Sequence, residues 1–444
     1  MNPHLQQRLT LFGLTMIAVG SCIGSGIFVT PGQIVKEVQH PALVILAWII
    51  GGTISLTGAL TFSEMGSLFP RSGGIYVFLK EAYGPLPAFL YGWVTLLVIN
   101  TGALAGLSVA FAEYSKVFWP TMTESGKMIL AGTVMVVLTL INGFGVHLSQ
   151  HLANFFTALK LLAILGIIIV GFMVYDPQTI PLDFSFRSGS MPSVWFGPLV
   201  LALVGVNFSV GGWHHATFVA GETINAARNV PRAMIYGVFI VTAMYLLINL
   251  AYMFMLPLSE IALTDRIAGV ALSNIVPWGG QVASVAIMLS ILGTISIYSM
   301  SAPRIYFAMA QDQIFFPALS KIHHRWHTPL AAMLFQVFWA LLILFFFQGY
   351  FNKIITFVTF VDALFFALGA STIFYFRKHK PDLPRPVRTW GYPLVPLIFV
   401  MLQTVFAFYV LKERPAQALP GLILIGVGLL AFAWFKKRQK PTIN

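Results

Sequence analysis

The chain has 444 residues, of which 58% are hydrophobic and only 9% are charged, and its mean hydropathy is +0.83. A soluble domain of this composition would expose large apolar surfaces to water, so the composition excludes soluble proteins and indicates an integral protein of the lipid bilayer. The net charge of +12 is scattered over short loops between apolar segments, which argues against nucleic-acid binding.

Twelve apolar segments reach the length of about 20 residues that crosses the hydrocarbon core of a bilayer. We therefore predict an all-α membrane protein with twelve transmembrane helices. In chain order the segments cover residues 11–38, 41–68, 86–115, 127–147, 152–175, 196–222, 232–256, 279–310, 329–347, 352–376, 392–411 and 417–435.

The distribution of basic residues predicts the orientation. An even number of spans puts residues 1–10 and the tail, 436–444, on the same side of the membrane. If that side is cytoplasmic, 16 of the 26 Lys and Arg residues lie inside and 8 outside. Because cytoplasmic loops are enriched in Lys and Arg, both termini are predicted to be cytoplasmic.

Two of the apolar segments contain glycine-rich interruptions. The first segment carries GSCIGSGIF at 20–28, and the sixth carries FSVGGW at 208–213. Irregular backbone is tolerated at membrane depth only where it is buried in protein or lines a cavity. Two breaks in corresponding helices therefore predict one solute site built from two unwound helices.

The spacing of the breaks predicts an internal repeat. Helices 1 to 5 (11–175) and helices 6 to 10 (196–376) are similar in length, and each set begins with a broken helix. Because each set has five helices, the second must enter the membrane inverted relative to the first. This is the plan of secondary transporters, and helices 11 and 12 (392–435) fall outside it.

The breaks also suggest what the solute is. Gly24, Ser25 and Gly26 would free backbone N–H groups at the start of a half-helix, where the helix dipole favours a carboxylate. Carbonyls around Ser21–Ile23 and Phe208–Gly211 would be free to accept from an ammonium group. Together they would bind a free α-amino acid. The alternative is that these glycines only allow tight helix packing.

Five stretches resemble the amino acid/polyamine/organocation transporters, in particular bacterial relatives of the L-type amino-acid transporters. They are VGSCIGSGIFVTPG (19–32), FSEMGSLFPRSGGIYVFLKEAYGPLPAFLYGW (62–93), KLLAILGIIIVG (160–171), FSVGGWHHATFVAGETINAARNVPRA (208–233) and RKHKPDLPRPVRTWGYP (377–393). The resemblance spans nearly the whole chain. It implies the five-plus-five inverted repeat of the leucine-transporter fold, with helices 1 and 6 broken, and alternating access.

The resemblance also implies roles for residues at the breaks. Ser25 and Gly26, with Gly24, would bind the substrate carboxylate. Carbonyls of Cys22, Phe208 and Gly211, in the segment that includes Ser209, would bind its ammonium group, and the Phe208 ring would form a gate over the substrate. The function implied is amino-acid exchange. Proton-coupled symport and transport of polyamines or modified amino acids are the alternatives.

Lys160 lies well inside the fifth apolar segment, where an unpaired charge costs roughly 2.5–3.5 kcal/mol. One interpretation is that its side chain extends to the membrane interface. The resemblance implies instead that its ammonium group replaces a sodium ion by binding carbonyls of the first break and the eighth helix, which makes transport sodium-independent. Thr294, Ser296 and Ser299 are candidate partners there, whereas Tyr298 replaces a small hydroxyl residue of the L-type relatives.

Two ionisable residues fall near the distal part of the predicted pocket. Asp362 interrupts the tenth helix, and His215 follows the second break by one turn. A carboxylate there would favour a cationic or hydrogen-bonding substrate side chain, or would couple protons. The alternative for Asp362 is a structural contact with a helix end, and for His214 and His215 a structural hydrogen bond. Glu64 and Glu222 are expected to stabilise a gate or loop near cytoplasmic helix ends.

The remaining motifs exclude other functions. The chain has a single cysteine, Cys22, and no nucleotide-binding or catalytic motif, so we expect no enzyme activity and no cofactor. His323, His324 and His327 are not expected to bind a metal. The loop at 119–127 lacks the cysteine through which eukaryotic L-type transporters bond to a heavy chain, so we expect no disulfide-linked partner and a bacterial inner-membrane carrier. The oligomeric state is left open.

Overall fold

The computed structural model describes residues 5–185, 195–264, 266–346 and 351–438, with side chains of α17 from residue 358 on. Residues 1–4 of the predicted N-terminal segment and 439–444 of the predicted tail lie outside this description. The described chain is helical throughout, and its only β-type pairing is an isolated bridge between Leu9 and Thr223. The all-α prediction is confirmed.

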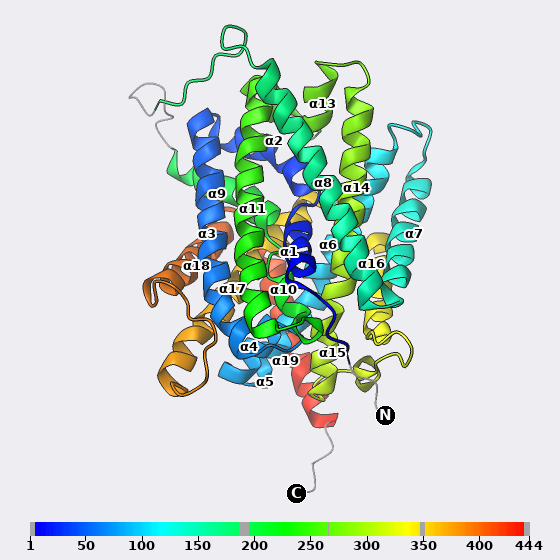
Figure 1. Cartoon of the computed structure of the whole chain (residues 1–444), viewed down its shortest axis with the longest axis vertical. Helices are drawn as coiled ribbons and strands as arrows, with labels where there is room; N and C mark the ends of the chain where they lie inside the picture. Colours follow the sequence, from blue (N-terminus) through cyan, green and yellow to red (C-terminus); the bar gives the residue numbers. More distant parts are fainter. Residues whose placement is uncertain (1–4, 186–194, 265, 347–350, 439–444) are drawn as a thin grey trace, which may run out of the picture.

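The helices form an elongated bundle (Figure 1). Their bounds are α1 Leu11–Cys22, α2 Gly26–Val38, α3 Pro41–Leu68, α4 Ile75–Tyr83, α5 Pro85–Val94, the π-helix η1 Thr95–Ile99, α6 Asn100–Ser115, α7 Glu124–Gly143, α8 Val146–Val174, α9 Phe196–Val210, α10 His215–Phe218, the 3₁₀-helix η2 Ala220–Glu222, α11 Ala226–Met255, α12 Leu258–Leu263, α13 Ile267–Ser273, α14 Gly279–Ser301, α15 Pro303–Gln311, the 3₁₀-helix η3 Pro317–Ser320, α16 Leu330–Phe346, α17 Phe351–His379, α18 Leu394–Glu413 and α19 Pro415–Arg438.

The described helices account for the twelve predicted spans. Nine are long and apolar enough to cross a membrane by themselves, and α1 with α2 forms a tenth span that bends by 42° at its break. The other two predicted spans correspond to α9 and α16, which are apolar but shorter. α9 is short because the sixth span ends at its break and continues only as α10 and η2. Four short helices were not predicted: α4, α12, α13 and the 3₁₀-helix η3.

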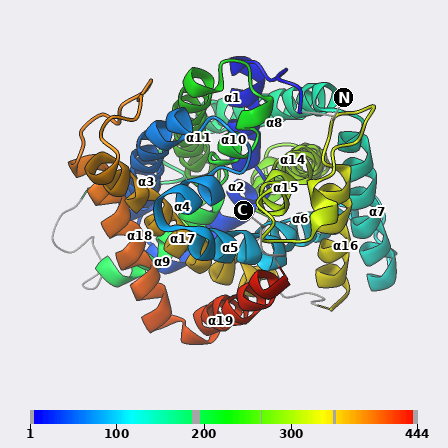
Figure 2. The same ribbon diagram turned by 90° about the horizontal axis from the view of Figure 1, so that it is seen from below.

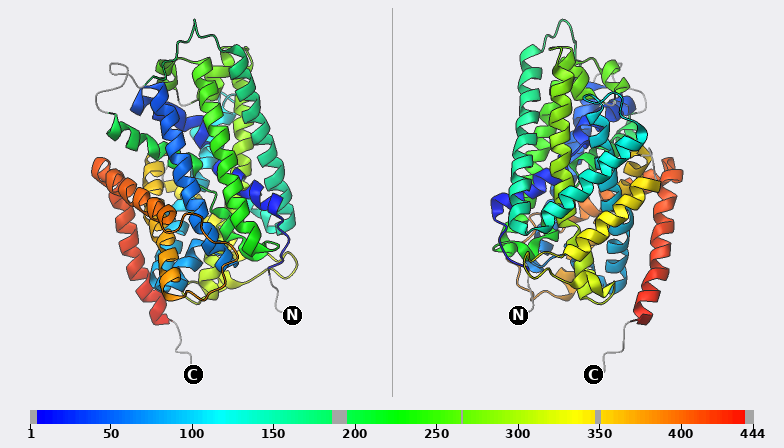
Figure 3. Two further views of the ribbon diagram at one scale, coloured as in Figure 1. Left: turned by 60° about the vertical axis from the view of Figure 1, so that its left-hand side comes forward. Right: turned by 90° about the vertical axis from the view of Figure 1, so that its right-hand side faces the viewer.

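The broken helices lie inside the bundle. α1 packs against α8, α11 and α14, and α2 packs against α9. α18 and α19 lie at the periphery (Figures 2 and 3). The described N-terminal segment and the end of α19 lie at the same end of the molecule (Figures 1 and 3), called the termini end below.

Large apolar side chains cover the outside of the bundle. Leu162 and Met173 of α8 are 64% and 80% exposed, and Phe408 of α18 and Leu430 of α19 are 68% and 74% exposed. Such a surface would be costly in water, whereas acyl chains solvate it without penalty. The exposed apolar surface and the long apolar helices together identify a multi-pass membrane protein.

Glycines allow the inner helices to approach closely. A Cβ on Gly237 of α11 would lie 2.7 Å from the Cβ of Ala18 in α1, and one on Gly20 would lie 2.2 Å from Thr157 Oγ1. Gly20 therefore serves tight packing, the alternative considered for the glycines of the first break. This packing fixes α1 against α8 and α11, so that the end of α1 has a defined position in the centre of the bundle.

Candidate functional site

The first break separates the helices α1 and α2. α1 ends at Cys22, and α2 begins at Gly26. The amide of Gly24 donates to the carbonyl of Cys22, two residues earlier, at 3.0 Å. This contact replaces the helical hydrogen bond to the residue four positions earlier, so the helix is interrupted here. Ser25 precedes α2, and its hydroxyl is buried without a hydrogen-bond partner. The first amides of α2 have no partner within the helix, so an unpaired hydroxyl lies beside the positive end of a helix dipole.

Lys160 of α8 fills the opposite side of the same break. Its Nζ donates to the carbonyl of Gly20 at 2.9 Å, to that of Ile23 at 2.6 Å and to Thr294 Oγ1 of α14 at 2.9 Å. The side chain is 1% exposed, which rules out the interpretation that it extends to the membrane interface. Of the three predicted partners on the eighth helix, Thr294 makes the contact. The ammonium group of Lys160 is thus bound by three oxygen atoms, two from carbonyls of the first break and one from a hydroxyl of α14.

The second break follows Val210, the last residue of α9. Gly211 to His214 form a turn before α10, with Gly211 N donating to Asn207 O at 2.9 Å. Gly212 has a φ of +121°, and a Cβ there would lie 2.7 Å from the carbonyl carbon and oxygen of Ser21. Ser21 Oγ donates to Gly212 O at 2.8 Å. The two breaks are therefore in direct contact, and the closest approach uses Gly212, which sequence reasoning did not single out.

Tyr245 of α11 connects the two breaks and was also missed. Its hydroxyl lies 3.0 Å from the carbonyl oxygen of Cys22 and 3.1 Å from that of Ser209. The amide of Gly24 also donates to Cys22 O. The Tyr245 hydroxyl has one proton, so it donates fully to only one of these carbonyls at a time, and binding of a substrate ammonium by Cys22 O stays a prediction.

A cavity of about 80 Å³ lies between the breaks. A buried water molecule needs roughly 10–15 Å³ by this measure, so the space holds a group of small-molecule size. Eight of the predicted binding residues line it: Cys22, Gly24, Ser25, Gly26, Phe208, Gly211, His215 and Asp362. They come from α1, α2, α9, α10 and α17, elements that are far apart in the sequence.

Ser209 is the predicted binding residue that does not line this cavity. Its hydroxyl lies 2.8 Å from Thr30 Oγ1 of α2, and a Cβ on Gly26 would lie 2.7 Å from it. The side chain therefore holds α9 against α2. Gly24 differs from Gly26 in that a Cβ there would meet only ordinary contacts, at 3.4 Å or more. A side chain therefore meets close contacts at Gly26 and Gly212, but not at Gly24.

The distal wall of the cavity contains His215 and Asp362. His215 Nδ1 lies 2.6 Å from Ser301 Oγ of α14, and its ring packs on Tyr298 with 4.3 Å between ring centroids. The imidazole is thus hydrogen-bonded to the bundle, as in the structural interpretation. Asp362 lines the cavity, and no hydrogen bond or ion pair joins it to any described residue. The structure therefore does not supply the helix-end partner considered for this carboxylate.

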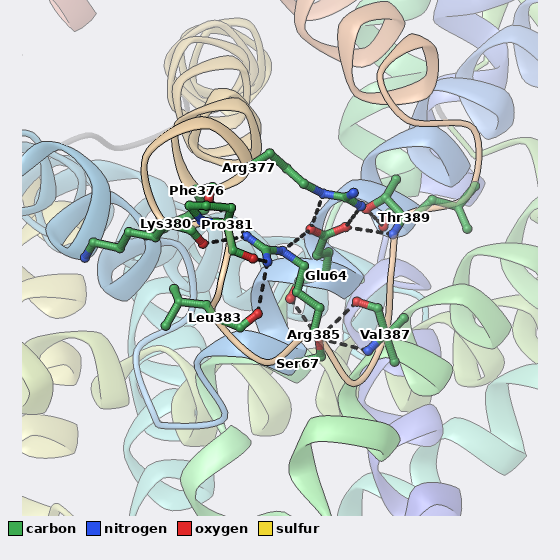
Figure 4. Close-up of polar contacts among 11 residues, drawn as sticks. Glu64, Ser67, Phe376, Arg377, Lys380, Pro381, Leu383, Arg385, Val387 and Thr389 are labelled. Carbon is green, nitrogen blue, oxygen red and sulfur yellow. Dashed lines mark hydrogen bonds and ion pairs between the residues drawn. The ribbon is translucent and has the colours of Figure 1, made fainter.

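Two buried ion pairs lie toward the termini end. Glu64 of α3 accepts from Arg377 at 2.8 and 2.7 Å and from the amide of Thr389 at 2.8 Å, while Arg385 lies beside it (Figure 4). These contacts hold the segment between α17 and α18 against the end of α3. Glu64 thus stabilises a loop, as predicted.

The second pair joins Glu222 of η2 to Arg304 of α15. Both hydrogen bonds are 2.8 Å, and both side chains are fully buried. The carbonyl of Glu222 also accepts from the amides of Arg8 and Leu9, at 2.8 and 2.9 Å. The segment before α1 is thereby tied to the segment after α10. Among the described residues no group of three His, Cys, Asp or Glu side chains is placed to hold a metal ion.

The sequence is similar to known transporters. The large neutral amino acids transporter small subunit 2 of Mus musculus is 29% identical over 439 residues, which cover 96% of this chain and 80% of that protein. The b(0,+)-type amino acid transporter 1 of Homo sapiens is 27% identical over 457 residues, with 99% and 92% covered. The cystine/glutamate transporter of Homo sapiens is 29% identical over 442 residues, with 97% and 86% covered.

The family model of amino acid permeases matches residues 9–432, a range that includes both breaks, Lys160 and Asp362. The resemblance found in the sequence is thereby confirmed over nearly the whole chain. The chain belongs to the amino acid permease family.

Proposed function

We propose that this chain is a sodium-independent carrier that exchanges amino acids across the membrane by alternating access. The family and the transporters to which the chain is similar support an amino acid as substrate. The observation that carries the proposal is the cation of Lys160, bound to carbonyls of the first break, beside a cavity in which the Ser25 hydroxyl is buried without a partner. Proton symport, and transport of polyamines or modified amino acids, are the alternatives.

In this proposal the substrate backbone lies between the two breaks. Its carboxylate binds the Ser25 hydroxyl and the first amides of α2, where the helix dipole favours a negative charge. Its ammonium group binds the carbonyls of Cys22 at the first break and of Phe208 and Gly211 at the second. The Phe208 ring lines the same cavity and is suited to cover the substrate during transport.

Lys160 supplies the positive charge that a sodium ion supplies in sodium-coupled carriers of this fold. A fixed ammonium group needs no ion gradient, so the free energy for uphill movement of one amino acid comes from downhill movement of another. Tyr245 complements this role because it bonds to both breaks and so couples the position of α1 to that of α9.

We further propose the membrane setting. Residues 11–175 and 196–376 form the two inverted repeats, and both termini face the cytoplasm of a bacterial cell. A covalent heavy chain is not required. Although the name of the mouse relative describes a small subunit, the single cysteine of this chain, Cys22, is buried at the end of α1. A non-reducing gel of the protein from its native membrane tests this, since a higher-mass band that collapses on reduction contradicts it.

The experiment for the main proposal is exchange in proteoliposomes. Radiolabelled amino acids are offered outside to vesicles that are empty or preloaded with unlabelled amino acid, in sodium or in choline buffer, with and without an inward proton gradient. We expect uptake only into preloaded vesicles, and equal uptake in both buffers. Accumulation in empty vesicles driven by protons would establish the symport alternative, and a sodium requirement would overturn the role proposed for Lys160.

The variant Lys160→Met tests that role directly. Methionine keeps an unbranched chain but removes three charge-assisted hydrogen bonds, each worth about 1.5–3 kcal/mol. Thr294 Oγ1 and Ser290 Oγ remain within 3.2 Å of the Ile23 carbonyl and offset part of the loss. We expect exchange to fall by about a hundredfold or more while the detergent-solubilised protein stays monodisperse. Normal exchange kinetics in this variant would contradict the proposal.

A further inference from the structure

The distal half of the cavity contains a carboxylate that nothing in the described part of the protein neutralises. Asp362 lies on α17, which packs against α9, α6 and the π-helix η1, and it lines the cavity. No described residue forms a hydrogen bond or ion pair with it. An ionised side chain at membrane depth is costly unless it is paired or hydrated, and such residues mark substrate or ion sites.

The cations of the bundle are not available to this carboxylate. Lys160 does not line the cavity, and its Nζ is committed to Gly20 O, Ile23 O and Thr294 Oγ1. Arg304 is paired with Glu222. Among the described residues that line the cavity there is no lysine or arginine. Among the described residues no cation balances Asp362, which leaves hydration, a proton or the cation of a substrate to do so.

Other groups in the wall also favour a donor. Asn100 Oδ1 of α6 and His214 Nδ1 are buried, and neither has a hydrogen-bond partner. Both side chains line the cavity, together with Gln403 of α18. A buried acceptor that stays unpaired costs about 1–3 kcal/mol. A ligand with several N–H donors satisfies the carboxylate and Asn100 Oδ1 together, and also His214 Nδ1 in the tautomer that accepts there, whereas an aliphatic side chain satisfies none of them.

The remaining walls fit the carbon chain of such a ligand. Tyr91, Trp213, Phe366 and Phe399 contribute aromatic surface to the cavity. Methylene groups pack favourably on rings, while the polar head extends to the acidic end. The combination of apolar walls with one acid at the end is the complement of an unbranched side chain that carries a terminal cation.

We propose that Asp362 selects amino acids with a cationic side chain, the class of lysine and ornithine, by serving as their counter-ion in the distal half of the cavity. This inference rests on the proposed function, because it assumes that the substrate backbone lies between the two breaks. The charges of the α-ammonium and α-carboxylate groups then cancel, and the side-chain cation balances Asp362, the one carboxylate among the described residues that line the cavity.

The experiment compares two substrates that differ only at the side-chain end. Lysine carries an ammonium group on four methylenes, and norleucine has a four-carbon chain without the charge. Exchange of each is measured in proteoliposomes for the wild type, Asp362→Asn, Asp362→Glu and the control Asp176→Asn. Asp176 is a matched acid in an exposed segment after α8, where it bonds to Gln178 and Thr179.

We expect the wild type to prefer lysine to norleucine in kcat/KM. Asp362→Asn should lower this ratio at least about tenfold, the loss of one charge-assisted contact. Asp362→Glu, which restores the charge, should keep the preference for lysine, and Asp176→Asn should leave the ratio unchanged. The melting temperature of each purified protein is also measured with lysine and with norleucine, a comparison that does not depend on turnover. Lysine should stabilise the wild type, Asp362→Glu and Asp176→Asn more than it stabilises Asp362→Asn.

The outcomes separate this inference from the proposed function. If the wild type exchanges norleucine but not lysine, the selection by Asp362 is refuted and the exchanger stands. If no amino acid is exchanged, the proposed function itself fails. If Asp362→Asn loses both substrates alike, or if lysine stabilises it as well as the wild type, Asp362 does not select the side chain, and the inference is overturned.

Discussion

The contact between the two breaks makes a sharp prediction at Gly212. A Cβ at this position would lie 2.7 Å from the carbonyl of Ser21 and 3.0 Å from the amide nitrogen of Cys22. Ordinary contact begins at 3.4 Å, so Gly212→Ala must move the two breaks apart by about 0.7 Å, the difference between 3.4 and 2.7 Å. The φ of +121° adds backbone strain that glycine does not have.

The two effects give the magnitude. Forcing a side chain into packed backbone costs about 1–3 kcal/mol, and a non-glycine residue in a disfavoured φ region costs about the same again. The sum, about 2–6 kcal/mol, corresponds to at least a tenfold loss in any process that needs the two breaks in contact. We therefore expect Gly212→Ala to lower amino-acid exchange more than tenfold and to lower the melting temperature of the purified protein.

The assay is exchange in proteoliposomes, with thermal unfolding in detergent followed in parallel. Gly166 of α8 provides the matched control, because a Cβ there meets nothing within 4 Å. Gly166→Ala should leave exchange unchanged and stabilise the helix by up to about 1 kcal/mol. Wild-type exchange together with a wild-type melting temperature in Gly212→Ala would refute the reasoning.

Two other variants test the surrounding contacts. Tyr245→Phe removes only the hydroxyl that bonds to both breaks, so exchange rates should fall about tenfold while the melting temperature changes little; unchanged kinetics would show that this link is dispensable. Glu222→Gln leaves the buried guanidinium of Arg304 without a counter-charge, which costs about 3–5 kcal/mol. Its melting temperature should drop by several degrees, the further replacement Arg304→Met should restore part of the loss, and a variant as stable as the wild type would contradict the assignment.

Helix ends and breaks could be predicted from local sequence at positions where proline or glycine occurs. The segment predicted at 41–68 is the helix α3, residue for residue, because Pro41 fixes its first turn and Pro70 follows its end. The break after Cys22 was expected from GSG, since glycine allows the backbone to leave the helix. The π-helical turn of η1 was not predicted, because its residues, TLLVI, are indistinguishable by composition from an ordinary apolar helix.

The site was only partly accessible to sequence reasoning. Unwound backbone and a lysine at membrane depth are local signals, so the breaks and Lys160 were found. Tyr245 reaches Cys22 across 223 positions of the chain, and its sequence context is that of any apolar helix. Ser209 was included among the binding residues because of its neighbours, and the packing of α9 on α2 places its hydroxyl beside that of Thr30. The contacts of Tyr245 and Ser209 depend on which faces of distant helices pack together, and a local sequence pattern does not contain that information.

The central claim is that the two breaks form one amino-acid site, and a structure with bound substrate tests it most directly. The purified protein in nanodiscs, saturated with an amino acid that it exchanges, would be imaged by electron microscopy. The account predicts density for the amino acid between α1 and α9, with its carboxylate at Ser25 and Gly26 and its ammonium group at the carbonyls that end α9. Substrate density elsewhere in the bundle, or a reversed backbone orientation, would contradict it.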